Sequence, residues 1–298
     1  MTLNLCIITS SYAFCRDDGA ASAGVFVRDF AAAVAEQGHQ VTVLTQRTSA
    51  ADAEPETSVP GQSDSQPGVN VRTFDWSGGR RPLASLRLSR LRDAWLMLRL
   101  LRNGGRALAA LHAEQNFDHL LAMWAVPAGV WARQLQRSGG VPYTVWCLGS
   151  DIWTYGRLPL LRQWVRGVLR SADHRYADGS KLADLASRLA GMPVDVLHSC
   201  RRLDRAETRR ISLDGTGPRF LFVGRYERVK GGDVLLEAMS RYVARQRRGF
   251  LYLFGGGSMA GELAQRAAAD DLRDHHDRYG DCRGGHGAGS GIHEGDHP

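Results

Sequence analysis

The chain has 298 residues, enough for one large domain or two moderate ones, and 43% of them are hydrophobic, which suffices to bury a core. This composition excludes a disordered or fibrous chain, and the longest nearly uncharged apolar run, residues 120–132, is shorter than the roughly 20 residues of a membrane-spanning helix. Five cysteines without a C-x-x-C pair argue against a disulfide framework and a zinc ribbon, so we expect a reduced, cytoplasmic compartment.

The N-terminal residues have the pattern of a β-α-β unit. Leu3–Thr9 is a near-continuous apolar run, typical of a strand covered on both faces, and it lacks the basic residues of a secretory signal. A helix is predicted from Val25 to Gly38, and Val41–Thr45 is the next strand. The short connections imply parallel strands in a doubly wound α/β layer.

Further elements follow in chain order. After an exposed loop at 48–70, we expect strands at 69–76 and 143–148 and an apolar stretch at 120–125. Helices are predicted at 88–101, 128–136, 160–170 and 181–189.

The segment Arg80–Arg106 contains eight arginines and one acidic residue, so its surplus equals the net charge of the whole chain, +7. Apolar residues recur in it at spacings of three and four, which predicts one amphipathic helix that holds this charge: Leu88, Leu91, Trp95, Leu98 and Leu101. Either its arginines face water, or they attract the helix to an anionic membrane surface. Nucleic-acid binding is the last alternative, because no recognised nucleic-acid motif accompanies the charge.

A charged, turn-rich segment at 201–218 is the predicted linker between a first domain, 1–200, and a second α/β unit, 219–272. The second unit has predicted strands at 219–224 and 250–254 and helices at 234–246 and 259–272. Residues 273–298 are rich in glycine and histidine and too poor in hydrophobic residues to form a core, so we expect a disordered tail without a metal site.

Three strand-to-helix loops contain candidate binding residues. The loop that ends at Gly24 has small residues ahead of a helix N-terminus, which suits a phosphate or sugar oxygen, but a flexible turn is the alternative. Gly149, Ser150 and Asp151 follow a strand, so Asp151 is placed either to accept a hydrogen bond from a sugar hydroxyl or to cap a helix.

The third loop, Val223–Gly232, has the most specific pattern. It places Arg225 and Lys230 ahead of a helix, and Lys230 is one of only two lysines in the chain. Two cations beside the N–H groups of a helix N-terminus suit a diphosphate, whereas a solvated surface loop is the alternative.

These segments, in this order, resemble the retaining GT-B glycosyltransferases of family 4, most of all in Leu221–Met239 followed by Leu253–Ser258. The resemblance covers roughly residues 3–270 and implies an α/β fold of GT-B type, with a complete N-terminal and a truncated C-terminal Rossmann-like domain. It also implies transfer of a sugar from a UDP- or GDP-sugar to a glycan or lipid-linked acceptor, with retention and without a metal or other cofactor.

The resemblance assigns roles to the candidate residues. Gly224, Arg225 and Lys230 would bind the donor diphosphate, and Gly24 and Gly255 would lie in loops around the substrate. Residues 149–151 would line the acceptor side, with Asp151 as the catalytic candidate.

Two positions depart from the family pattern. Leu148 stands where many members have a histidine, and Glu294 has no partner at the spacing of the family's late glutamate pair. We therefore expect a glycosyltransferase that is incomplete as encoded, located in the cytoplasm with peripheral contact at the inner membrane surface. The alternative is a non-catalytic module that binds a glycan or a protein.

Overall fold

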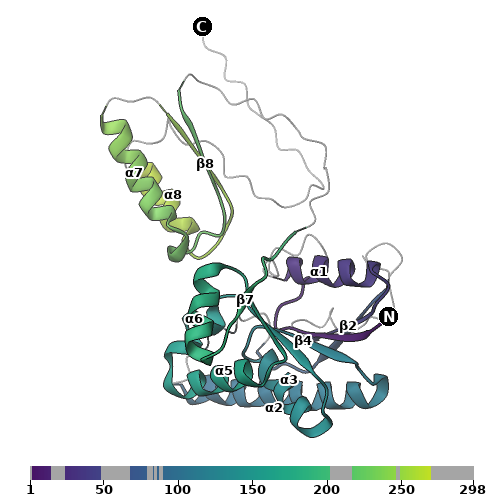
Figure 1. The fold of residues 1–298 in the computed structure, drawn as a ribbon. Coiled ribbons are helices and arrows are strands. Elements are labelled where there is room, and N and C mark those ends of the chain that lie inside the picture. The colour runs from purple at the N-terminus through teal and green to yellow at the C-terminus, as the bar shows by residue number, and fades with distance from the viewer. Residues whose placement is uncertain are drawn as a thin grey trace. The chain divides into compact units, whose positions relative to one another are not determined.

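The structure is a computed structural model that describes residues 2–14, 24–47, 68–78, 83, 86, 90–201, 217–245 and 249–269. The chain forms two compact units, residues 1–204 and 205–298, which are described separately below (Figure 1). The boundary falls inside the predicted linker, 201–218. Most of that linker and all of the predicted tail, 273–298, lie outside the described residues.

Unit 1 is built on a seven-stranded sheet in the order β3-β2-β1-β4-β5-β6-β7, in which every neighbouring pair is parallel. Its strands are β1 (Asn4–Ile8), β2 (Gln40–Gln46), β3 (Val69–Phe74), β4 (His119–Met123), β5 (Tyr143–Cys147), β6 (His174–Ala177) and β7 (Asp195–Val196). The strand order reverses between β1 and β4, as in a doubly wound, Rossmann-like sheet. The predicted strands therefore occur, and β6 and β7 are additional.

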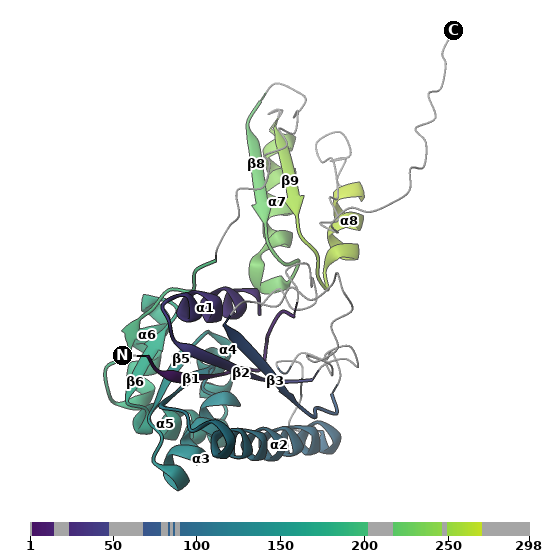
Figure 2. The ribbon, with the colours of Figure 1, turned by 90° about the vertical axis from the view of Figure 1, so that its right-hand side faces the viewer.

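Helices cover both faces of this sheet. They are α1 (Val25–Glu36), α2 (Leu91–Gln115), α3 (Ala128–Gly139), α4 (Ser150–Trp153), α5 (Pro159–Ser171) and α6 (Ser180–Ala190). Figures 1 and 2 show α1 on one face and α2, α3 and α5 on the other. Side chains alternate between the two cores, since Cys6 and Ile8 pack in the cluster of α2, α3 and α5 while Ile7 packs in that of α1.

A glycine in the middle of α2 lets α3 come close. A Cβ atom on Gly104 would lie 2.3 Å from the indole ring of Trp131, which is fully buried. The indole Nε1 of Trp131 donates a hydrogen bond to the carbonyl oxygen of Leu101 at 2.9 Å. The ring is therefore fixed against α2 both by packing and by this hydrogen bond.

The helix predicted at 88–101 begins at Leu91 instead and ends at Gln115. The apolar residues that predicted this helix do not form its buried face, because Leu91, Trp95 and Leu98 are 90%, 53% and 64% exposed. The face that packs on the core consists of other residues, among them Leu96, Met97, Leu100, Leu108 and Leu111. The helix also contains only four of the eight arginines of the segment, so the prediction that one helix holds the whole charge surplus is wrong.

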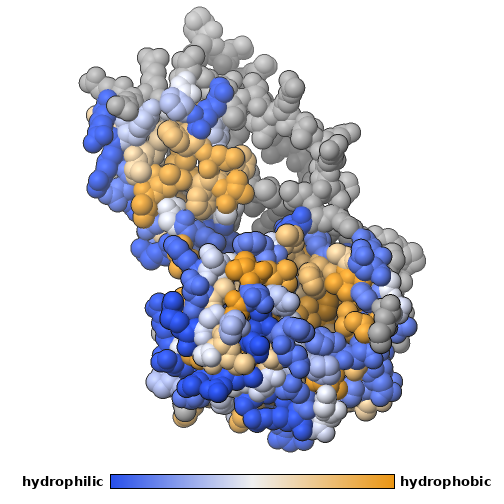
Figure 3. Space-filling model, viewed as in Figure 1, coloured by the Kyte–Doolittle hydropathy of each residue, from blue (hydrophilic) through white to orange (hydrophobic). Residues whose placement is uncertain are grey.

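Unit 2 contains a two-stranded parallel sheet of β8 (Arg219–Val223) and β9 (Phe250–Phe254). Its helices α7 (Gly232–Ala244) and α8 (Ala260–Ala269) lie on one face of that sheet (Figure 1). Side chains on the other face of β8 are open to solvent, since Leu221 and Val223 are 65% and 74% exposed. Hydrophobic residues gather over this sheet in the space-filling view (Figure 3).

Candidate functional site

The carboxyl ends of β1, β4 and β5 are where unit 1 can bind a ligand, because open α/β sheets do so at the point where their strand order reverses. Three turns begin there, at residue 9 after β1, at residue 124 after β4 and at residue 148 after β5. The predicted site residues of unit 1 belong to the first and the third of these turns, and residues 15–23 of the first lie outside the described residues.

Gly24 is the residue before α1, and the protein's own packing requires a glycine there. A Cβ atom at this position would lie 2.7 Å from the backbone of Tyr12. The same loop is held by Arg28, whose Nη1 donates a hydrogen bond to the carbonyl oxygen of Phe14 at 3.0 Å. The predicted contact of this loop with a substrate stays a prediction.

Asp151 is fully buried and binds backbone groups. Its Oδ2 accepts a hydrogen bond from the N–H of Ala125 at 2.9 Å. Its Oδ1 accepts hydrogen bonds from the N–H groups of Gly149 at 3.0 Å and Ile152 at 3.1 Å. These bonds join the turn after β4 to the turn after β5. The predicted contact of Asp151 with a sugar hydroxyl is therefore corrected to a positioning role, because backbone donors occupy the carboxylate and no part of it is exposed.

Burial raises the pKa of the Asp151 carboxyl, and the backbone N–H groups that donate to it oppose this rise. Burial, and then the charge of Asp151, also raise the pKa of the neighbouring Cys147 thiol. A thiol that stays protonated is a poor nucleophile.

Gly149 and Ser150 form the turn into α4. Gly149 has a φ of 123°, a conformation that side chains rarely permit, and a Cβ atom on it would lie 3.2 Å from the ring of Trp153. Ser150 is half-buried at the first position of α4. The prediction that these residues line the acceptor side is not tested by their geometry.

Trp124, at the end of β4, is a candidate that no sequence motif indicated. Its φ of 68° is unusual for a bulky residue, and such strained conformations are concentrated at functional sites. Its N–H donates a hydrogen bond to the carbonyl oxygen of Trp146 at 2.9 Å, and its ring packs against the edge of Phe26 with the centroids 6.1 Å apart. Trp124 therefore places an aromatic side chain at the point where the strand order reverses.

In unit 2, the loops that follow β8 and β9 are hydrogen-bonded to one another. The N–H of Gly224 donates to the carbonyl oxygen of Phe254 at 2.9 Å, and that of Tyr226 donates to Gly256 at 2.8 Å. The N–H of Met259 returns a bond of 2.9 Å to the carbonyl oxygen of Tyr226. The loop with the predicted diphosphate residues is thus held beside the glycine-rich loop that contains Gly255.

Glycine is required in the second loop by this close approach. A Cβ atom on Gly255 would lie 1.8 Å from the carbonyl oxygen of Gly224, and Gly255 has a φ of 154°. A Cβ atom on Gly257 would lie within 3.0 Å of three backbone atoms of Tyr226. The structure therefore brings the predicted residues Gly224 and Gly255 together.

The cations of the loop after β8 differ in their partners. Arg228 forms ion pairs with Asp233 at 3.4 Å and Glu262 at 3.7 Å. Arg225 and Lys230 are exposed, and neither forms an ion pair with another described residue. Lys230 ends the 3-10 turn that leads into α7. Two cations thus remain available to an anion next to a helix N-terminus.

Glu227 is fixed within the same loop. Its carboxylate accepts a hydrogen bond of 2.8 Å from the Oγ of Ser258. Hydrogen bonds from Ser258, with a smaller contribution from the charge of Arg225, lower the pKa of Glu227. This carboxylate therefore ties the loop after β8 to the loop after β9.

The described residues meet neither the requirements of a metal site nor those of a membrane-spanning helix. They contain no cluster of histidine, cysteine and acidic side chains suited to a metal ion. None of their helices is both long and apolar enough to cross a bilayer. The predicted histidine tail and the position of Glu294 lie outside the described residues.

Comparisons with known proteins give one match at the level of sequence families. The description of that family is glycosyl transferase 4-like domain, and it matches residues 22–200, more than half of the chain. No curated protein sequence matches.

Several solved structures share the fold. HepE from Anabaena in complex with UDP-glucose is 12% identical, with a TM-score of 0.56 over 92% of this chain and 68% of that one. A glycosyltransferase from Rickettsia africae is 11% identical, with a TM-score of 0.54 over 95% of this chain and 69% of that one. The lipopolysaccharide outer core galactosyltransferase WaaB is 10% identical, with a TM-score of 0.52 over 92% of this chain and 67% of that one. The predicted α/β fold of GT-B type is confirmed by these similarities.

Proposed function

Because the chain belongs to the glycosyl transferase 4-like family, we propose that it transfers a sugar from a UDP- or GDP-sugar to a glycan or lipid-linked acceptor, with retention of configuration. The observation that supports this most is the pair of exposed cations, Arg225 and Lys230, on a loop held at the carboxyl ends of β8 and β9. A UDP-linked donor is supported by HepE, which has been solved with UDP-glucose and with UDP and glucose.

In this proposal the loops of unit 2 bind the donor diphosphate. The guanidinium of Arg225 grips two oxygens, Lys230 adds a point charge, and the N–H groups at the start of α7 face the same anion. Gly224 and Gly255 keep the loops after β8 and β9 close together, so that both loops can lie beside the phosphates. As the bond to the sugar breaks, these groups stabilise the charge that develops on the leaving diphosphate, so no metal or further cofactor is required.

Unit 1 supplies the acceptor side in this proposal. Gly149 and Ser150 line it, and Gly24, the residue before α1, lies beside the substrate. Asp151 acts as a positioning residue, since its hydrogen bonds to Ala125 and Gly149 hold two of the turns in place. Trp124 adds an apolar surface on which a sugar ring can pack.

Titration of the folded chain with UDP and GDP tests the donor site. Arg225→Ala and Lys230→Ala are each expected to weaken nucleotide binding roughly tenfold or more, because each removes a charge-assisted hydrogen bond. Arg245→Ala removes the same charge at the other end of α7 and serves as the matched control. Calorimetry measures the affinities, and the configuration of any product sugar, read by NMR, tests retention.

Two results would contradict the donor assignment. One is the absence of nucleotide binding by the folded chain, and the other is an equal loss in all three variants, which would indicate general attraction between charges. Saturable glycan binding that does not respond to any nucleotide would instead support a non-catalytic binding module.

We also propose that α2 contacts an anionic membrane surface, as a lipid-linked acceptor requires. Leu91, Trp95 and Leu98 are exposed and recur at helical spacing, so they form one apolar row on the outer face of α2. Arg102 continues this row one turn later, and the guanidinium of Arg99 lies over the ring of Trp95, 4.7 Å from its centroid. An apolar row between arginines is the pattern of a helix that lies in a lipid headgroup layer.

Sedimentation with vesicles tests this contact. We expect binding to phosphatidylglycerol vesicles at low salt, weaker binding at high salt and none to phosphatidylcholine vesicles. Replacing both Trp95 and Leu98 by serine should abolish binding, whereas Leu185→Ser, at a half-exposed leucine on α6, should not. No binding at low salt, or equal effects of the two changes, would contradict the proposal.

A further inference from the structure

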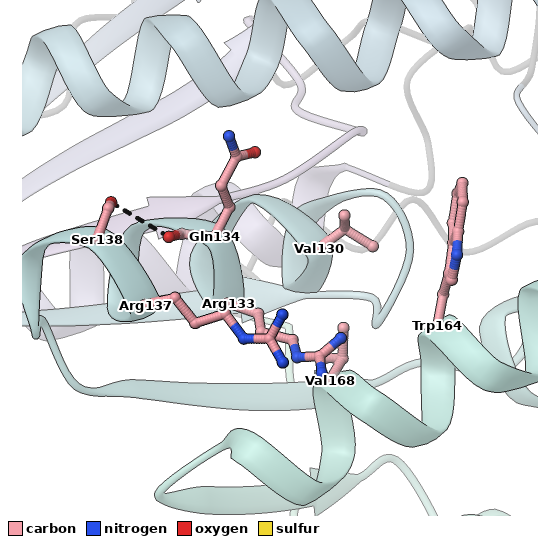
Figure 4. A pocket seen from close by; sticks show the side chains of 7 residues that line it. All are labelled: Val130, Arg133, Gln134, Arg137, Ser138, Trp164 and Val168. Atoms are coloured by element: carbon pink, nitrogen blue, oxygen red, sulfur yellow. Dashed lines mark hydrogen bonds between the residues drawn. The ribbon is translucent and has the colours of Figure 1, made fainter.

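A groove of about 340 Å³ lies between α3 and α5, and its residues belong to none of the loops described above. Figure 4 shows that Arg133 and Arg137, both on α3, direct their guanidinium groups toward the same part of this groove. Trp164 and Val168 of α5 and Val130 of α3 supply apolar walls. The groove therefore has a cationic part and an apolar part side by side.

The guanidinium of Arg133 is held in place by α5. Its Nε donates a hydrogen bond to the Oγ of Ser171 at 3.1 Å, and that hydroxyl donates to the carbonyl oxygen of Gly167 at 2.8 Å. A Cβ atom on Gly167 would lie 2.4 Å from Nη1 of Arg133, so the guanidinium lies directly over the glycine. Only the Nε is used in this contact, which leaves the Nη groups to a ligand. Arg133 is thus oriented before any ligand arrives.

The two arginines lack a carboxylate partner among the residues that the structure describes. Burial, and then the charge of Arg137, lower the pKa of Arg133, so the second cation acts against the first. Like charges four residues apart on one helix repel each other, and an anion that both can reach offsets this repulsion. An oxyanion in the groove would remove this repulsion.

The apolar part of the groove is set by Trp164, which is 41% exposed, together with Val130 and Val168. An exposed indole at the side of a groove offers a flat surface of large apolar area, on which a sugar ring or a lipid chain can pack. A free inorganic anion would leave this surface unused.

We propose that the groove between α3 and α5 binds the phosphate group of a phosphorylated sugar or of a lipid headgroup, with Arg133 and Arg137 on its oxygens and Trp164 against its apolar part. A phosphate monoester fits better than a carboxylate, because its three terminal oxygens can accept from both guanidinium groups at once. The two sources share this chemistry. The site is separate from the donor loop and does not depend on the donor assignment.

The test uses the full chain with Arg225→Ala and Lys230→Ala, so that phosphate binding at the donor loop does not contribute. Glucose 6-phosphate, glucose and inorganic phosphate are the soluble probes, and vesicles with or without phosphatidic acid probe the lipid source. Tryptophan fluorescence and calorimetry measure binding. We expect saturable binding of glucose 6-phosphate or of phosphatidic acid vesicles, with glucose unbound and inorganic phosphate bound more weakly.

Variants of the groove decide whether binding occurs there. Arg137→Gln, at an exposed side chain, and Arg133→Gln should each weaken binding roughly tenfold or more. Arg170→Gln, at an exposed arginine of α5 outside the groove, should leave the affinity for the ligand unchanged. Trp164→Ala should weaken binding of glucose 6-phosphate but not of inorganic phosphate. The proposal is overturned if neither phosphate source binds, or if Arg137→Gln and Arg170→Gln have equal effects.

Discussion

The carboxylate of Asp151 accepts backbone hydrogen bonds from two turns of unit 1. One donor, Ala125, lies 26 residues earlier in the chain. The position of Asp151 after a buried strand indicates a residue at the ligand-binding edge of the sheet, and this is where it lies. The partner could not be predicted, because the contact depends on β4 and β5 being neighbours in the sheet.

Asp151→Asn is expected to lower the free energy of unfolding by roughly 2–3 kcal/mol. The amide keeps the size of the side chain, but its NH₂ group faces a backbone donor that then has no acceptor. Urea denaturation followed by circular dichroism measures the change. Asp184→Asn, at an exposed aspartate of α6, is the control and should be nearly neutral. Equal effects at both positions would show that the buried hydrogen bonds are not responsible.

His119 at the start of β4 is expected to make the free energy of unfolding depend on pH. Burial lowers its pKa below the ordinary value of 6.5, and its Nε2 lies 2.8 Å from the Oγ1 of Thr144. The unfolded chain therefore takes up a proton near pH 6.5 that the folded chain does not, so stability is lost as the pH falls from 6.5 toward the folded pKa. The difference in unfolding free energy between wild type and His119→Gln should change across this window. A difference that is constant with pH would contradict the assignment.

The resemblance places Gly24 and Gly255 in loops around the substrate, and the structure shows what lies against each of these glycines. At Gly24 it is the backbone of Tyr12, and at Gly255 it is the carbonyl oxygen of Gly224. The sequence therefore identifies such positions, but it does not distinguish a ligand from a neighbouring segment of the same chain. That distinction depends on contacts between residues far apart in sequence.

At the scale of the element, α2 shows why periodicity alone can select the wrong face. The helix has one apolar row at Leu91, Trp95 and Leu98 and another through Leu100 and Leu108. Both rows satisfy the spacing of an amphipathic helix, and the second is buried because Trp131 of α3 packs against that side. Packing against α3 therefore determines which row of α2 is buried, and this cannot be read from the spacing of residues within α2.

Adjacent glycines in α2 provide a matched pair of substitutions. Gly104→Ala should destabilise the protein by about 1–2 kcal/mol, because the new Cβ atom meets the buried ring of Trp131. Gly105→Ala should be neutral or stabilising by up to about 1 kcal/mol, since its nearest neighbour is the flexible end of Gln134 and alanine favours the helix. Thermal unfolding of both variants measures the difference. The opposite order would show that α2 and α3 are less closely packed.

The strands β6 and β7 were not predicted because their own sequences lack the pattern of a strand. β6 reads His-Arg-Tyr-Ala and β7 only Asp-Val, so neither shows an apolar run or an alternation of useful length. They form because β5 offers an edge to pair with. The long apolar strands could be predicted, whereas these short ones are determined by their neighbours.

At the scale of the whole molecule, the doubly wound sheet followed from the succession of strands and helices along the chain. The apolar run of β1 also predicts that its side chains point alternately into the hydrophobic cores on the two faces of the sheet, as Cys6, Ile7 and Ile8 do. The exposed apolar side chains on β8 could not be predicted, since they depend on the number of helices that cover a two-stranded sheet.

The two units should differ in local stability. Amide hydrogens of β1, β4 and β5 are expected to exchange much more slowly than those of β8 and β9, because the sheet of unit 1 is packed on both faces while Leu221 and Val223 are exposed. Hydrogen exchange of the full chain, read by mass spectrometry, measures this. Equal protection in the two sheets would contradict it.

The position of β1 inside its sheet, between β2 and β4, has a consequence for synthesis. β1 is the first strand of the chain, yet the N–H of its first residue, Asn4, bonds to the Oδ2 of Asp118, 114 residues later. At a translation rate of about 5–20 residues per second, one edge of β1 stays unpaired for roughly 6–23 seconds after it is made. A nascent chain thus exposes an interior strand of its own sheet to chaperones, and to the same strand on neighbouring ribosomes, until β4 is made and pairs with it.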